Sequence, residues 1–106
     1  MAKYLIEARY TIDGARGLMK DGGTGRRTAA EELLKSVDGK LEAFYFAFGG
    51  SDAFVIVDLP DNASVAAASI TLAASGAATG KTTVLITPEE MDQAAKKSIS
   101  YTPPGR

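Results

Sequence analysis

Residues 40–59 decide the fold and read KLEAFYFAFGGSDAFVIVDL. Two runs rich in aromatic and β-branched residues, Lys40–Phe48 and Ala53–Leu59, flank the short segment Gly49–Asp52. Residues of this kind favour strands, and Gly-Gly-Ser-Asp has the composition of a hairpin turn. We therefore expect two strands that pair antiparallel.

The preceding residues predict a strand and then a helix. Lys3–Thr11 alternates in polarity, as a half-buried strand does, and Arg26–Val37 carries apolar residues at helical spacing before the stop signal Asp38–Gly39. Between them, Asp13–Lys20 predicts a short helical turn. Asp21–Gly25 predicts a loop, because three glycines weaken a helix.

A second helix and a fourth strand follow the hairpin. Pro60–Asn62 ends the strand and caps an alanine-rich helix over Ala63–Ser75, and Lys81–Thr87 predicts a strand. Thr87-Pro88-Glu89-Glu90 has the pattern of a capping box, which starts a third helix that runs to about Lys97.

This order predicts an α+β fold with a ferredoxin-like βαββαβ antiparallel sheet and an added C-terminal helix. The chain has 106 residues, so we expect one domain over residues 1–97 and a tail over residues 98–106.

The composition excludes several chemistries. The absence of cysteine and histidine excludes disulfides, thiolate or imidazole metal sites and Ser-His-Asp triads, and no cofactor is expected. A net charge of −1 without a basic block argues against nucleic acid as a partner. No apolar run reaches membrane-spanning length, so we expect no membrane partner and a cytoplasmic location.

Two glycine-rich segments resemble phosphate-binding loops. Ser75–Thr82 approaches the phosphate-loop pattern, but it follows a predicted helix and starts a strand, which is the reverse of the order that such a loop needs. Gly22–Arg27 does precede a helix and places two guanidiniums beside free N–H groups. A surface loop is the preferred interpretation there over a small-anion site.

Both faces of the predicted sheet are apolar, although two helices can cover only one. We expect the helices to cover Tyr4, Ile6, Ala8, Tyr10, Phe44, Phe46, Phe48, Val55, Val57, Val84 and Ile86. The other face would then carry Leu5, Leu41, Tyr45, Phe54, Ile56 and Leu85. Apolar side chains in this number do not stay in water, so the chain is expected to pair with a copy of itself through this face.

Four polar residues, Glu7, Arg9, Tyr45 and Asp58, alternate onto the same face and are the candidate ligand-binding residues. Burial between two sheets would perturb their protonation, as a general acid or base requires. A structural ion network is the preferred interpretation, with Arg9 between Glu7 and Asp58 or paired with their counterparts in a second subunit.

The residues also resemble a known family. Tyr4–Thr11, Gly39–Leu41, Phe48–Gly49, Asp52 and Val55–Asp61 are similar to the GYD domain over about residues 3–95. The family's Gly-Tyr-Asp is Gly50-Ser51-Asp52 here, so the aromatic residue is lost while the glycine and the acid remain. The resemblance implies a small bacterial protein of the dimeric α+β barrel type with no established biochemical role.

Three functions are compatible with these observations. The first is a homodimer that binds a small molecule in the cavity between its sheets. The second is a cofactor-independent enzyme, monooxygenase-like or isomerase-like, in which Tyr45, Glu7 or Asp58 acts as acid or base, by analogy of fold. The third is a structural or regulatory subunit without a ligand.

Overall fold

The computed structural model describes all 106 residues and has the predicted α+β, ferredoxin-like order with an added C-terminal helix. The elements are β1 (Ala2–Tyr10), α1 (Ile12–Lys35), β2 (Lys40–Phe46), β3 (Ala53–Leu59), α2 (Asn62–Ala74), β4 (Ala78–Leu85) and α3 (Pro88–Ala95).

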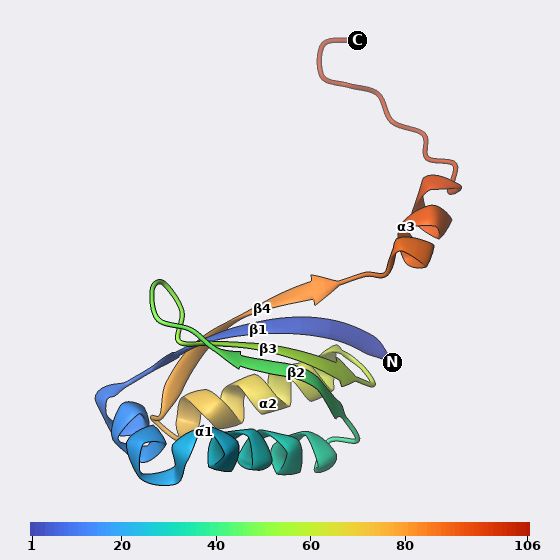
Figure 1. Cartoon of the computed structure of the whole chain (residues 1–106). Helices are drawn as coiled ribbons and strands as arrows, with labels where there is room; N and C mark the ends of the chain where they lie inside the picture. The colour runs from blue at the N-terminus through green and yellow to red at the C-terminus, as the bar shows by residue number, and fades with distance from the viewer.

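The four strands form one antiparallel sheet in the order β2-β3-β1-β4. Figure 1 shows α1 and α2 together on one face of this sheet. We call the other face, which no helix of the chain covers, the open face. Strand register places on it the following residues: Lys3, Leu5, Glu7, Arg9, Lys40, Ala43, Tyr45, Phe54, Ile56, Asp58, Thr79, Lys81, Thr83 and Leu85.

The core lies between the sheet and the two helices. Only 12 of the 106 residues are buried, so the core of one chain is small, and Tyr4, Val57 and Leu59 are its largest fully buried side chains. The Tyr4 hydroxyl donates a hydrogen bond to Asn62 Oδ1 at 2.7 Å, which joins the central strand to the first turn of α2. A buried tyrosine needs such a partner, because an unpaired hydroxyl is costly to bury.

The break predicted over Asp21–Gly25 is present but is confined to Gly22, where two helical segments of α1 meet. Only Gly22 leaves the helical conformation, with φ of 77° and ψ of 169°, and the helix resumes immediately after it. A positive φ is available to glycine without steric cost, so one glycine introduces a kink and the others remain helical. The helix also begins earlier than expected, capped by Thr11, whose side chain accepts a hydrogen bond from the Gly14 N–H.

Strand alternation does not place Leu41 and Phe48 correctly, and the helix cover that it predicts for Val84 and Ile86 is also wrong, since these residues are 62% and 49% exposed. The pairing of β2 with β3 shifts between Leu41 and Ala43, and this bulge turns Leu41 toward the helices, where it packs against the core. Phe48 follows the end of β2 and is fully exposed. The strand β4 starts at Ala78, after a helix that ends at Ala74 and a turn at Gly76, so helix precedes strand in this glycine-rich segment as expected.

The last part of the chain leaves the body of the protein. Beyond β4, α3 and the tail project away on the side of the sheet opposite α1 and α2 (Figure 1). Every residue from Pro88 to Thr102 is exposed. The helix itself has a complete capping box between Thr87 and Glu90, as the sequence predicts.

Gly14 and Gly17 on α1 make a matched test of this packing. A Cβ at Gly14 would lie 1.8 Å from the Ala77 carbonyl oxygen, whereas a Cβ at Gly17 would meet nothing within 4 Å. We expect Gly14→Ala to lower the free energy of unfolding by about 1–3 kcal/mol through overpacking. We expect Gly17→Ala to raise it by about 1 kcal/mol through helix propensity. Thermal unfolding followed by circular dichroism measures both, and equal effects would contradict the close approach of α1 to residue 77.

Candidate functional site

All four sequence-predicted site residues lie on the open face, but they do not form one group. Glu7 and Tyr45 belong to the same row across the sheet, since each pairs with Phe54 on the strand between them. Two strand spacings separate them, which is about 10 Å between backbones. Arg9 lies one step further along β1, and Asp58 lies near the opposite end of the sheet.

The prediction that Arg9 bridges Glu7 and Asp58 within one chain is wrong. Asp58 pairs with Lys3 in the register of β1 and β3, and Lys3 is six residues from Arg9, or about 20 Å along the strand. Antiparallel pairing is the reason, because it carries Asp58 toward the start of β1. Whether Arg9 meets carboxylates of a second subunit stays a prediction.

The cation that Asp58 does use is Lys3. The Lys3 ammonium contacts Asp58 Oδ1 at 2.9 Å and Glu42 Oε2 at 2.7 Å, with about a quarter of the lysine side chain exposed. These two hydrogen bonds, that to Glu42 first, raise the pKa of Lys3 above its ordinary value. Glu42 reaches the site from the bulge of β2, which alternation alone does not reveal.

Apolar side chains occupy the middle of the open face. Tyr45 is 70% exposed and Phe54 is 37% exposed, while Leu5, Ile56 and Leu85 are half-buried. They lie on neighbouring strands and share their rows with charged residues, Leu85 with Lys3 and Asp58, and Tyr45 and Phe54 with Glu7 and Lys81. A surface of this kind is typical of an interaction site.

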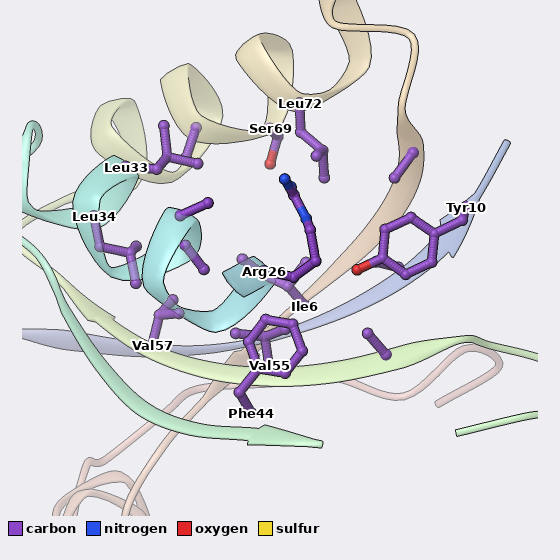
Figure 2. A pocket seen from close by; sticks show the side chains of 16 residues that line it. Ile6, Tyr10, Arg26, Leu33, Leu34, Phe44, Val55, Val57, Ser69 and Leu72 are labelled. Carbon is purple, nitrogen blue, oxygen red and sulfur yellow. The ribbon is translucent and has the colours of Figure 1, made fainter. Parts of the chain in front are cut away.

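The structure also contains a cavity on the other side of the sheet. It lies between the sheet and the helices α1 and α2 and has a volume of about 130 Å³. Fourteen of its sixteen lining residues are hydrophobic, among them Ile6, Phe44, Leu33 and Leu72 (Figure 2). An apolar cavity with few polar groups is the usual form of a small-molecule site.

Arg26 is the only charged residue that lines this cavity. Figure 2 shows its side chain extending from α1 toward Ser69 and Leu72 of α2. Its one ion pair is with Asp21, at 3.7 Å between Nη1 and Oδ2, which is too long for a hydrogen bond. The guanidinium therefore keeps its hydrogen-bonding capacity at the edge of an apolar space.

Arg26 begins the predicted helix and also belongs to Gly22–Arg27, for which a surface loop is preferred to a small-anion site, whereas Ser69 is not among the predicted site residues. The signal for Arg26 was nevertheless in the sequence, because residues 26, 29, 30 and 33 share one face of a helix. Three of these positions hold Ala29, Ala30 and Leu33, which line the cavity together with the arginine. No comparable pattern marks Ser69.

Two further properties bear on the chemistry. No group of three or more histidine, cysteine, aspartate or glutamate side chains is arranged to hold a metal ion. None of the helices combines the length and the apolar character that crossing a bilayer requires.

The Asp52 carboxylate, from the segment that resembles a family motif, joins the hairpin to β1. It accepts a hydrogen bond from the Tyr10 N–H at 2.9 Å, while the Asp52 N–H donates to the Ala8 carbonyl at 2.8 Å. The acid of the motif therefore has a structural role. The family model described as GYD domain matches residues 4–95. No curated protein and no solved structure matches the chain.

Lys3→Met is expected to lower the melting temperature, because it leaves the carboxylates of Glu42 and Asp58 without their common cation. Lys20→Met, at an exposed lysine of α1, is the control and should have little effect. The pKa of Lys3 is raised on folding, so its contribution is complete below its ordinary value of 10.5 and is lost as pH rises through the folded value. The difference between wild type and Lys3→Met should therefore be the same at pH 7 and pH 9, and a difference that vanished by pH 9 would contradict the network.

Proposed function

The chain belongs to the GYD domain family, and on that premise we propose that it functions as a homodimer that binds a small, largely apolar molecule. The observation that carries the binding function is the cavity of about 130 Å³ between the sheet and the helices. Dimer formation is supported separately, by surfaces that one chain leaves uncovered.

The cavity has the properties of a preformed binding site. Its lining combines hydrophobic residues from both helices and the sheet with a small number of polar groups. An apolar cavity of about 150 Å³ holds a benzene molecule, so a cavity of this volume accommodates the body of a small aromatic or branched compound. Elements of one chain build the lining, so each subunit of a dimer carries its own site.

The open face supports self-association. Its apolar centre, around Ile56 and Phe54, has no partner in the chain, and two sheets packed face to face would remove it from water. In such a dimer Glu7, Arg9, Tyr45 and Asp58 would lie at the interface or at its rim. The unpaired Arg9 is then expected to meet a carboxylate of the second subunit.

The large area of exposed surface also supports self-association. The chain exposes 7572 Å², whereas a compact monomer of 11.0 kDa exposes about 5,600 Å². Its radius of gyration is 17.0 Å, against about 13 Å for a compact chain of this length. The excess of about 2,000 Å² exceeds the roughly 800 Å² that each partner buries in a standard interface.

The helix α3 contributes to this excess. It has 8 residues, none of them buried, and isolated helices shorter than about 12 residues are marginal in water. Met91, Ala94 and Ala95 form one apolar stripe on it, and Met91 is 55% exposed. Since α3 projects on the side of the open face (Figure 1), the second copy that covers this face is the partner on which α3 would pack.

Ile56→Lys tests the dimer at the centre of the open face. A lysine from each subunit would be buried in the apolar centre of the interface, so we expect the dissociation constant to rise by about 100-fold or more. Light scattering over a range of concentrations measures it. Ala66→Lys, at an exposed position of α2, is the control and should remain dimeric. A monomeric wild type at micromolar concentration, or a dimer unaffected by Ile56→Lys, would contradict the proposed interface.

Ala68→Leu tests binding in the cavity. Ala68 is buried and lines the cavity, so a leucine there should fill it and abolish binding of benzyl alcohol, a neutral probe of suitable size. Titration calorimetry measures the binding, and native mass spectrometry of the purified protein reports any copurified compound. The exposed Ala66→Leu is the matched control on the same helix and should bind as wild type does. Absence of binding by wild type, or equal binding by Ala68→Leu, would refute the proposed site.

A further inference from the structure

Three polar groups, those of Tyr10, Arg26 and Ser69, line the same part of the cavity (Figure 2). Their chemistry indicates which class of apolar ligand the cavity binds. We infer that the cavity selects a small apolar monocarboxylate, with the Arg26 guanidinium as the group that binds its carboxylate. This inference rests on the proposed binding function and adds the chemical class of the ligand.

The charge of Arg26 is the first argument. The Arg26 side chain is 31% exposed, it lines a cavity in which fourteen of sixteen residues are hydrophobic, and its one ion pair, with Asp21, measures 3.7 Å. A cation that faces an apolar surface loses part of its hydration there, and pairing with hydrogen bonds compensates that loss. Guanidinium and carboxylate match as two parallel hydrogen bonds, so a carboxylate ligand supplies the pairing that the chain leaves incomplete.

Two hydroxyl groups support the same ligand chemistry. Figure 2 shows the Tyr10 hydroxyl and the Ser69 hydroxyl directed into the space beside Arg26, from β1 and α2 respectively. The other hydroxyl side chains of α2 donate hydrogen bonds within the chain, Ser64 to Asp61 and Thr71 to the Ala67 carbonyl. Ser69 and Tyr10 have no such partner for their hydroxyls, and both can donate to a carboxylate oxygen.

The charge and the size of the ligand follow from the same lining. No acidic side chain lines the cavity, so nothing in it would pair with a cationic ligand. One arginine matches a single negative charge better than a doubly charged phosphate ester. The volume of about 130 Å³ fits a body of about six carbon atoms, by comparison with cavities that hold benzene.

Calorimetry with benzoate and benzyl alcohol tests the inference, because the two probes share a ring and differ in charge. We expect wild type to bind benzoate at least about tenfold more tightly than benzyl alcohol, as hydrogen bonds to a charged group predict. Arg26→Met should remove this preference and keep the affinity for benzyl alcohol, which shows that the cavity is intact. Arg27→Met, at the exposed neighbouring arginine, is the matched control and should keep the preference.

The failures of the two proposals are distinguishable. Equal affinities for benzoate and benzyl alcohol in wild type, or a preference that survives Arg26→Met, would overturn the carboxylate class and leave the binding function standing. If wild type binds neither probe, both the ligand class and the proposed binding function are wrong. If Arg26→Met binds neither benzoate nor benzyl alcohol while Arg27→Met binds both, Arg26 maintains the shape of the cavity. That result would overturn its role in anion binding.

Discussion

The sheet has two faces and the chain supplies helices for only one of them. A strand pair is stable only when its apolar side chains leave water, and here α1 and α2 cover the side that carries Tyr4 and Val57. The open face keeps Phe54 and Ile56 without a partner from the same chain. The core is small, the exposed surface is large and α3 projects away from the sheet, because the chain itself covers only one face of the sheet.

Small side chains on α1 and α2 allow these helices to lie close to the sheet and leave a cavity on the covered face. Gly14 lets the start of α1 approach the Ala77 carbonyl, and the alanines of α1 and α2 place helix backbones near the sheet. Ala30 and Ala68 face the sheet without filling the space between the two helices, so an apolar cavity remains. A void in a core costs stability. The proposed binding function rests on this cavity and on Arg26, whose one ion pair, with Asp21, measures 3.7 Å.

Backbone pairing decides which charges meet. Lys3, Glu42 and Asp58 form the one network on the open face because antiparallel register brings β3 back to the start of β1 and a bulge turns Glu42 toward them. Arg9 is on the same face and only six residues away from Lys3, yet it has no ion pair in the chain. Two charged residues on the same face of a sheet therefore come into contact only when strand pairing also places them in the same row or in neighbouring rows.

The sequence by itself determined the element types and their order, the hairpin around Gly49–Asp52, the capping box at Thr87 and the apolar character of both sheet faces, because each depends on local propensity or on a period of two or 3.6 residues. Only the tertiary structure decided the restriction of the break in α1 to Gly22, the inward turn of Leu41 at the bulge, the pairing of Asp58 with Lys3 and the position of Arg26 beside Ser69. These features depend on strand register and on the distance between elements remote in the chain. Residue patterns predict which face of a strand or helix a side chain occupies. They do not show which residues of another element lie against it.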